Sequence, residues 1–188
     1  MATVREGHKL ALIVVDTQVG VLNRAWDTAR IVANVARAVQ RARAHAVPVL
    51  WVQHADSEMA AGSPQWQLVP ELVPQEGEPI VHKQYESSFE NTTLEAELAR
   101  LGVSHVVLAG AMTNWCIRAT AYGALDRGYD MTLVKDAHTT GTVELDDGFK
   151  IEAEKIVQDL NLVMRWLSYP GRKAGTATAE ALDFGAAA

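Results

Sequence analysis

Residues 105–123 read HVVLAGAMTNWCIRATAYG, and this segment contains the only cysteine of the 188-residue chain. Its first five residues are mainly apolar and β-branched, which is typical of a buried strand. A Gly-Ala pair ends that run, and apolar residues then recur at helical spacing as far as Gly128, a typical residue at a helix end. The segment therefore predicts a strand, a tight turn and a helix with Thr113 or Asn114 as its N-cap.

Cys116 lies in the first turn of this predicted helix. Free amide N–H groups and the positive end of the helix dipole favour a thiolate at that position, and the same amides can bind an oxyanion. A single cysteine beside small residues is also typical of a buried, unreactive side chain. The position of Cys116 alone leaves both interpretations open, so other residues must decide between them.

The composition is that of an ordinary globular protein, with 48% hydrophobic and 21% charged residues. A chain of this length is expected to form a single domain over residues 1–188. The formal charge of −6 argues against nucleic acid or an anionic membrane as a partner, since both attract basic surfaces. One cysteine forms no internal disulfide, the start MATVREGHKL has no signal-peptide pattern, and no apolar run is long enough to span a membrane. We therefore expect a cytoplasmic protein.

Strand and helix patterns alternate along the chain. Short aliphatic stretches predict six strands, at 10–15, 49–53, 79–82, 105–109, 130–134 and 161–166. Helical patterns lie between them, at about 27–46, 92–102, 113–128 and 146–159. This order predicts an α/β fold, a doubly wound three-layer α/β/α sandwich with a six-stranded, mainly parallel sheet.

Two segments fall outside this alternation. Residues 54–78 contain two glycines and three prolines with little periodicity, which predicts a long surface loop of the kind that shapes sites. The tail at 170–188 is small and weakly apolar, so we expect it either to fray or to pack against a neighbouring subunit.

Three reactive side chains each follow the end of a predicted strand. Asp16 follows the first strand, Lys83 the third and Cys116 the fourth. In doubly wound folds ligands bind at the carboxyl ends of the strands, so these residues are expected to meet at one edge of the sheet. Taken singly, Asp16 is explained equally well as a helix cap, and Lys83 as an ordinary surface lysine. Their common position favours a site.

Three segments carry a resemblance to a known family: LALIVVDTQ at 10–18, HKQYESSFENTTLEAEL at 82–98 and LAGAMTNWCIRATAYGALDRGYDMTLVKDA at 108–137. With these motifs the chain resembles the isochorismatase-like cysteine hydrolases, which include nicotinamidases, N-carbamoylsarcosine amidases and ureidoacrylate amidohydrolases. The most specific motif is Gly-x-x-Thr-x-x-Cys directly after a strand. The resemblance implies the isochorismatase-like hydrolase fold and a homo-oligomer, a dimer or a tetramer.

The resemblance also implies a role for each reactive residue. Cys116 is the implied nucleophile, Asp16 the base that takes its proton, and Lys83 the cation that orients both. A cis peptide bond between Ala111 and Met112 is implied as well, with the backbone N–H groups of Met112 and Cys116 forming an oxyanion hole. The implied reaction is the hydrolysis of a C–N bond of a small amide or ureide through a thioester.

The sequence departs from this family at the metal site of the nicotinamidases, which use an Asp-x-His pair and a further histidine. Here the second strand is followed by the reverse order, His54-Ala55-Asp56, and the loop holds no second histidine before His82. A transition-metal site needs at least three convergent ligands, so we expect no catalytic metal and no other cofactor. The departure also argues against nicotinamide as the substrate.

The substrate pocket is expected to have aromatic walls and to hold a small, largely neutral molecule. The residues predicted to bind substrate are Gln18, His54, Tyr85, Phe89 and Trp115. Gln18 is also explained as part of a turn. Some of the aromatic residues are also explained as members of the core or of a subunit interface. Trp26 and Trp66 are further candidates. His138 is expected to line the pocket or to bond to the loop, and Asp136 to brace the loop after its strand.

Two other functions compete with amide hydrolysis. Vinyl-ether hydrolysis of isochorismate uses the same fold and the aspartate without a thiol, so the presence of Cys116 argues against it. A binding protein that keeps the fold without catalysis is the other alternative. The presence of all three implied catalytic residues disfavours it.

Overall fold

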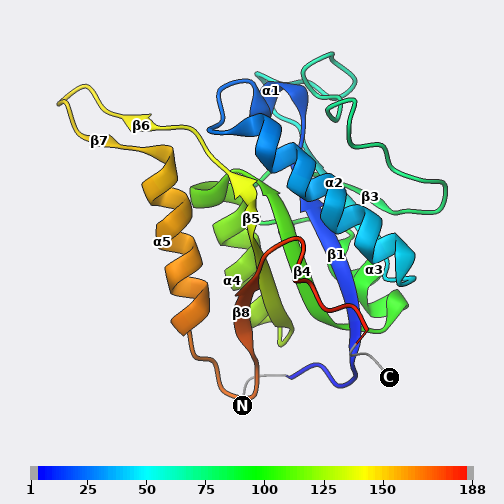
Figure 1. Ribbon diagram of the computed structural model, residues 1–188. Helices are drawn as coiled ribbons and strands as arrows, with labels where there is room; N and C mark the ends of the chain where they lie inside the picture. Colours follow the sequence, from blue (N-terminus) through cyan, green and yellow to red (C-terminus); the bar gives the residue numbers. More distant parts are fainter. Residues whose placement is uncertain (1–3, 186–188) are drawn as a thin grey trace.

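The computed structural model describes residues 4–185, and its central feature is a six-stranded parallel sheet (Figure 1). The strands lie in the order β3 (Ile80–Lys83), β2 (Val49–His54), β1 (Lys9–Val15), β4 (Val103–Ala111), β5 (Asp130–Thr139) and β8 (Ala174–Ala177). Each neighbouring pair is parallel. The predicted α/β fold with a six-stranded parallel sheet is confirmed.

Helices cover both faces of this sheet (Figure 1). The helices are α1 (Val19–Leu22), α2 (Thr28–Ala44), α3 (Leu94–Leu101), α4 (Arg118–Asp126) and α5 (Ala153–Trp166). Leu12 and Val14 of β1 pack towards α2, whereas Ile13 and Val15 pack towards α3, α4 and α5. Because both faces of β1 are buried, the strand has a continuous aliphatic sequence.

The predicted sixth strand at 161–166 is wrong, because these residues form the last turns of α5. Val157, Leu160 and Met164 recur at helical spacing and are buried, which explains the helix. The sixth strand is β8, in the tail that was expected to fray or to pack on a neighbour. Up to residue 185 the tail does not fray but continues along its own sheet, and Leu182 and Phe184 pack on the same side as α2. Packing of the tail on a neighbouring subunit stays a prediction, and residues 186–188 lie outside the described residues.

The predicted start of the helix near residue 146 is also wrong. Residues 143–151 form an antiparallel hairpin of β6 (Val143–Glu144) and β7 (Lys150–Ile151), which projects from the body (Figure 1). Asp147 accepts a hydrogen bond from the backbone N–H of Phe149, and Gly148 has a positive φ of 83°. Asp147 therefore stabilises a tight turn instead of capping a helix.

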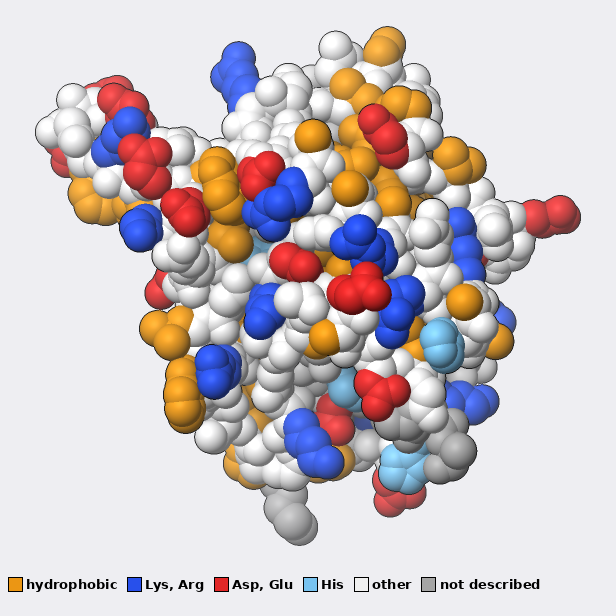
Figure 2. Space-filling view, viewed as in Figure 1, with side chains coloured by type: hydrophobic (Ala, Val, Ile, Leu, Met, Phe, Trp, Pro, Cys, Tyr) orange, Lys and Arg blue, Asp and Glu red, His pale blue; other side chains and the backbone are white. Residues whose placement is uncertain are grey.

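The surface combines charges of both signs. Figure 2 shows Lys and Arg side chains interspersed with Asp and Glu over the face that carries α2. Among residues 4–185, no helix has the length and apolar character that crossing a membrane requires.

The long segment between β2 and β3 contains neither helix nor strand, and Glu78 anchors its end. The Glu78 carboxylate accepts hydrogen bonds from the Arg43 guanidinium, from Trp51 Nε1–H at 2.7 Å and from the Gln75 N–H at 2.9 Å. Burial alone would raise the pKa of Glu78, but these donors outweigh it and lower the pKa. Glu78 therefore stabilises the folded chain as a carboxylate.

Replacing Glu78 by Ala is expected to lower the free energy of unfolding by about 2 kcal/mol, since Arg43 and Trp51 lose a largely buried acceptor. Because the folded-state pKa lies below the usual value of 4.5, this stabilisation is complete above pH 4.5 and is lost as the pH falls further. Urea denaturation of the wild type and of Glu78→Ala at several pH values measures this effect. The difference in unfolding free energy between the two proteins should become smaller as the pH falls below 4.5. Glu180→Ala is the control, since Glu180 is 74% exposed in its pair with Arg37, and a change within about 0.5 kcal/mol is expected.

Candidate active site

Asp16, Lys83 and Cys116 meet at one rim of the sheet: Asp16 directly follows β1, Lys83 is the last residue of β3, and Cys116 lies in the turn after β4. Lys83 Nζ lies 2.7 Å from Asp16 Oδ2 and 3.2 Å from Cys116 Sγ. It also donates to the Tyr85 carbonyl oxygen at 3.1 Å. The structure thus brings together the three residues that the sequence places at strand ends.

Two members of this cluster are closed to solvent, with the Lys83 side chain 0% and the Asp16 side chain 2% exposed, whereas Cys116 is partly exposed. Burial raises the pKa of Asp16, and the Lys83 ammonium offsets this only in part. Burial acts to lower the pKa of Lys83, but the charges of Asp16 and Cys116 outweigh it, so that pKa is raised. Lys83 therefore stays protonated between an acid and a sulfur.

Cys116 does not rest as the thiolate that its sequence position suggested. Burial raises the pKa of the Cys116 thiol to about 12, with a further contribution from the negative charge of Asp16. The expected helix N-terminus is wrong in detail, because Thr113–Ile117 form a π-helical turn and α4 begins only after it. The sulfur is thus a neutral thiol that needs a base. Asp16 Oδ1 is buried without a hydrogen-bond partner among the described residues, and it belongs to the carboxylate that interacts with the thiol.

Two backbone features bring Asp16 close to the turn that carries the cysteine. Asp16 has a positive φ of 50°, a conformation that Asp adopts more readily than most residues. Gly110 on β4 has a φ of 121°, and a Cβ at this position would lie only 2.0 Å from the Val15 carbonyl oxygen. The register of β4 against β5 also shifts between Leu108 and Gly110. Only glycine permits this approach of β4 to β1.

The backbone of the turn after β4 begins with a cis peptide bond and an N–H group that has no acceptor among the described residues. The peptide bond between Ala111 and Met112 is cis. The Met112 carbonyl oxygen accepts the N–H groups of Trp115 and Ile117, each at 3.1 Å, whereas the N–H of Met112 has no acceptor within residues 4–185. The N–H of Met112, directly before the turn that carries Cys116, is thus left without a hydrogen-bond acceptor in the described part of the chain.

Gln18 is fully buried, and its side chain bonds only to backbone groups. Its Nε2 donates to the carbonyl oxygens of His54 at 2.9 Å and Trp66 at 2.8 Å, and its Oε1 accepts the His54 N–H at 2.8 Å. Gln18 therefore joins the end of β2 and the long loop to the start of the site. We infer that it supports the pocket without touching substrate.

His54 is a fourth polar group at the cluster. Its Nδ1 lies 3.2 Å from Lys83 Nζ and its Nε2 lies 3.0 Å from Asp56 Oδ2. An ammonium has only donors, so Nδ1 is the acceptor and Nε2–H donates to Asp56. Residues 4–185 contain no group of three or more His, Cys, Asp or Glu side chains placed to hold a metal.

The predicted aromatic residues have different positions. Tyr85 and Trp115 are about half exposed next to Lys83 and Cys116. Phe89 instead lies in the core, where its ring stacks on Tyr129 at 6.1 Å between centroids. A cleft of about 360 Å³ borders Lys83 and Tyr85.

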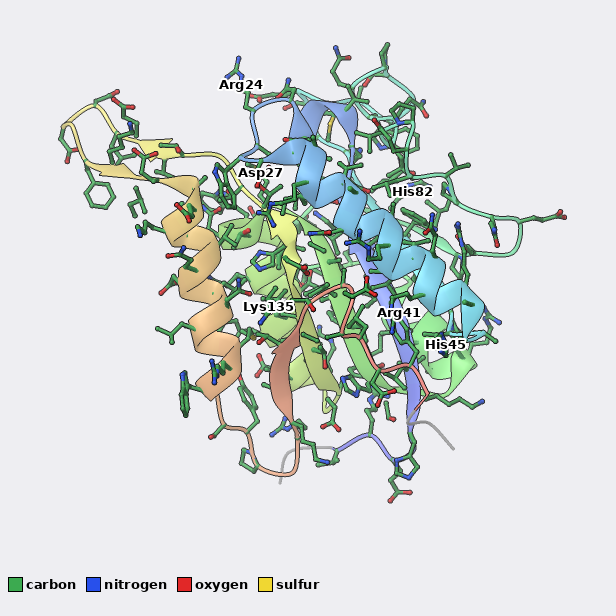
Figure 3. All side chains as sticks on the ribbon, in the orientation of Figure 1. Arg24, Asp27, Arg41, His45, His82 and Lys135 are labelled. Atoms are coloured by element: carbon green, nitrogen blue, oxygen red, sulfur yellow. The ribbon has the colours of Figure 1, made fainter. Side chains whose placement is uncertain are left out.

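Two tryptophans bind other parts of the chain. Trp66 contacts the His82 ring at 5.5 Å between centroids, and His82 lies on the edge strand β3 (Figure 3). The N–H of Trp26 donates to the Thr140 carbonyl oxygen just beyond β5. Asp136 lies within β5, which runs further than predicted, and it accepts the N–H of Ala179 at 2.8 Å. Asp136 therefore holds the tail and not a loop.

The fold and the site place the chain among α/β proteins with a buried Asp–Lys–Cys cluster at the carboxyl rim of a parallel sheet. Residues 10–160 match the Isochorismatase domain. The chain belongs to the isochorismatase family.

Curated relatives include two named amidohydrolases. The ureidoacrylate amidohydrolase RutB of Methylobacterium radiotolerans is 31% identical over 71% of this chain and 69% of its own length. The maleamate amidohydrolase of Pseudomonas putida is 38% identical over 46% of this chain and 42% of its own. A secreted isochorismatase effector, Isc1, of Verticillium dahliae is 32% identical, and this match spans 57% of that protein. The chain thus spans between two fifths and about two thirds of these relatives.

Solved structures show the same fold. An isochorismatase of Pseudomonas putida superposes with a TM-score of 0.81 at 30% identity, covering 93% of this chain and 92% of that one. A cysteine hydrolase of Pseudomonas syringae superposes with a TM-score of 0.83 at 22% identity, covering 92% of this chain and 89% of that one. The second likeness concerns the fold alone.

Proposed function

We propose that this protein is a cysteine-dependent hydrolase that cleaves a C–N bond of a small amide or ureide. The observation that carries the proposal is the contact of the buried Lys83 Nζ with both the buried Asp16 and the partly exposed Cys116. The two relatives named amidohydrolases support this class of reaction. The contact of the sulfur with Lys83 favours amide hydrolysis over vinyl-ether hydrolysis, in which a thiol has no role.

The first half of the proposed reaction forms a thioester. Asp16 takes the proton from the Cys116 thiol, and the Lys83 ammonium stabilises the resulting thiolate. The sulfur attacks the substrate carbonyl carbon, while the N–H groups of Met112 and Cys116 stabilise the oxyanion. Asp16 then gives its proton to the nitrogen, the C–N bond breaks, and ammonia or an amine leaves.

The second half hydrolyses the thioester. Asp16 takes a proton from a water molecule, whose oxygen attacks the thioester carbonyl. The C–S bond breaks, the acid product leaves, and the proton returns from Asp16 to the sulfur. A raised pKa suits a carboxylate to accept and release a proton in each half-reaction.

The proposal also assigns the walls of the pocket. Tyr85 follows Lys83 closely in the chain and Trp115 directly precedes Cys116; both are about half exposed, and they offer flat apolar surfaces to a small substrate. Lys83, the cation at the centre, is already engaged by Asp16 at 2.7 Å. A small and largely neutral amide or ureide fits these groups best.

An ammonia-release screen over small amides and ureides tests the proposed function. We expect at least one compound to release ammonia with the wild-type protein, and the Cys116→Ala variant serves as the blank. Trapping of the acyl group on Cys116, seen as a mass increase after acid quenching, is the second readout. Hydrolysis that persists in the Cys116→Ala variant would overturn covalent catalysis.

A further inference from the structure

His138 is a buried ionisable residue that the proposed reaction does not use. It lies near the end of β5, and none of its surface is exposed. Its Nδ1 lies 2.9 Å from Thr113 Oγ1, and its Nε2 lies 3.0 Å from Asn161 Oδ1 on α5. The imidazole therefore links a helix on one face of the sheet to the turn that carries Cys116.

The chain of hydrogen bonds fixes the proton on this imidazole. Asn161 Nδ2 donates to the carbonyl oxygen of Lys135 at 2.9 Å, and a carbonyl can only accept. Figure 3 shows Lys135 on β5, next to α5. Asn161 Oδ1 therefore faces His138 and accepts its Nε2–H, which leaves Nδ1 of a neutral ring as an acceptor. The Thr113 hydroxyl must donate to it.

The environment keeps the ring neutral. Burial lowers the pKa of His138 to about 4, although the Asn161 hydrogen bond and the charge of Asp136 act in the opposite direction. At neutral pH the ring thus has one donor and one acceptor, each already paired. The direction of the Thr113 hydroxyl bond therefore does not change at pH values well above the pKa of His138.

Thr113 is the first residue of the π-helical turn Thr113–Ile117, and Cys116 is the fourth. A π-helical turn is wider than an α-helical one and is rare, so it needs contacts from outside to hold it. A second contact comes from the same strand end, where Thr140 Oγ1 donates to Asn114 Oδ1 at 2.6 Å. Side chains at the end of β5 therefore restrain the start of the turn.

We propose that His138 is a positioning residue which, through the Thr113 hydroxyl, holds the turn that aims Cys116 and the two backbone N–H groups at the substrate carbonyl. The kinetic test of this inference rests on the proposed function. Its second test, the rate of chemical labelling of Cys116, depends on the geometry alone. His138 touches neither substrate nor the reacting atoms. Its contribution is to the alignment of the sulfur with Asp16 and Lys83.

A pair of Thr113 variants separates the hydrogen bond from the packing. Thr113→Val keeps the branched shape and loses the hydroxyl, whereas Thr113→Ser keeps the hydroxyl and loses a methyl group. We expect kcat to fall about 10- to 100-fold in Thr113→Val with KM within about threefold of wild type, because misalignment of a nucleophile mainly affects the chemical step. Thr113→Ser is expected to retain kcat within about threefold.

Two substitutions of His138 form a second matched pair of variants. In His138→Asn the amide oxygen can occupy the place of Nδ1 and accept the Thr113 hydroxyl, whereas in His138→Gln the amide group reaches the place of Nε2 and Asn161. We expect the Asn variant to be the more active of the two. Thr113→Val and His138→Gln together are expected to be little worse than either alone, because both remove the same contact.

The protein offers a control in a second, partly buried His–Thr bond elsewhere in the sheet. His105 Nε2 lies 2.8 Å from Thr132 Oγ1, a bond that also joins β4 to β5 but lies near the amino ends of these strands. Thr132→Val is expected to leave kcat at the wild-type value, because this bond lies at the other end of the strands from Cys116. Equal kcat losses in Thr132→Val and Thr113→Val would overturn the proposal, as would a Thr113→Val variant that raises KM alone.

Alkylation of Cys116 by iodoacetamide tests the same positioning without any substrate. Since burial and Asp16 raise the thiol pKa, a turn that loosens should return the pKa towards its usual value and increase the rate. We expect labelling at least about fivefold faster in Thr113→Val and His138→Gln than in wild type, Thr113→Ser and Thr132→Val. Uniform labelling rates in all five proteins would overturn the proposal. If the screen finds no hydrolysis while these rates differ as expected, the proposed function fails and the positioning role stands.

Discussion

Replacing Asp16 by Asn is expected to have opposite effects on hydrolysis and on thiol reactivity. Hydrolysis should fall by about 10³-fold or more, because the base that takes the proton from Cys116 is lost. Alkylation of Cys116 should become faster at a given pH. Burial raises the thiol pKa and the negative charge of Asp16 raises it further, so an uncharged amide lowers the pKa and leaves more thiolate next to Lys83.

Two measurements on one variant check this prediction. The pH dependence of iodoacetamide labelling should shift to lower pH in Asp16→Asn, while ammonia release on the best substrate falls towards the Cys116→Ala blank. Asp126→Asn is the control, since Asp126 accepts the Tyr169 hydroxyl at 3.0 Å at the far end of α4. Slower labelling of Asp16→Asn than of wild type would contradict the conclusion that the charge of Asp16 adds to burial in raising the pKa of the Cys116 thiol.

The sequence predicts most of the sheet because strands buried on both faces have a distinctive composition. The cores of β1, β2, β4 and β5 are continuous aliphatic runs, and each was predicted within a few residues. The strand β8 reads Ala-Gly-Thr-Ala and carries no such signal. Its place at the sheet edge depends on backbone pairing with β5, which leaves no hydrophobic pattern.

In the site, too, the features that follow from the order of strands are predicted, and those that depend on contacts between distant residues are not. The positions of Asp16, Lys83 and Cys116 follow from topology, because parallel strands bring their carboxyl ends to one rim. The helix position of Cys116 favours a thiolate, whereas burial and the charge of Asp16 raise the thiol pKa, and no local pattern encodes these two effects. The support from Gln18 also depends on a partner, His54, that is 36 residues away. The pKa of Cys116 and the role of Gln18 therefore depend on contacts between distant residues, which the order of strands does not reveal.

Replacing Gly110 by Ala is expected to destabilise the fold more than any other single methyl group at a glycine of the sheet. The added Cβ would lie 2.0 Å from the Val15 carbonyl oxygen and 2.7 Å from its nitrogen, and the φ of 121° is itself unfavourable for alanine. Both clashing atoms are backbone, so no side-chain rotation relieves them. Strands β1 and β4 must separate next to Asp16, which we expect to cost about 4 kcal/mol or more of unfolding free energy.

Urea denaturation and ammonia release together measure this effect. Any Gly110→Ala protein that still folds should also have lost activity, because separating β1 from β4 moves Asp16 away from the turn that carries Cys116. Gly175→Ala is the matched control, since a Cβ at Gly175 on β8 meets no atom within 4 Å. We expect that variant to keep full activity and a stability within about 1 kcal/mol of wild type. If Gly110→Ala were as stable as Gly175→Ala, the close approach of β1 and β4 could not be what brings the acid to the sulfur.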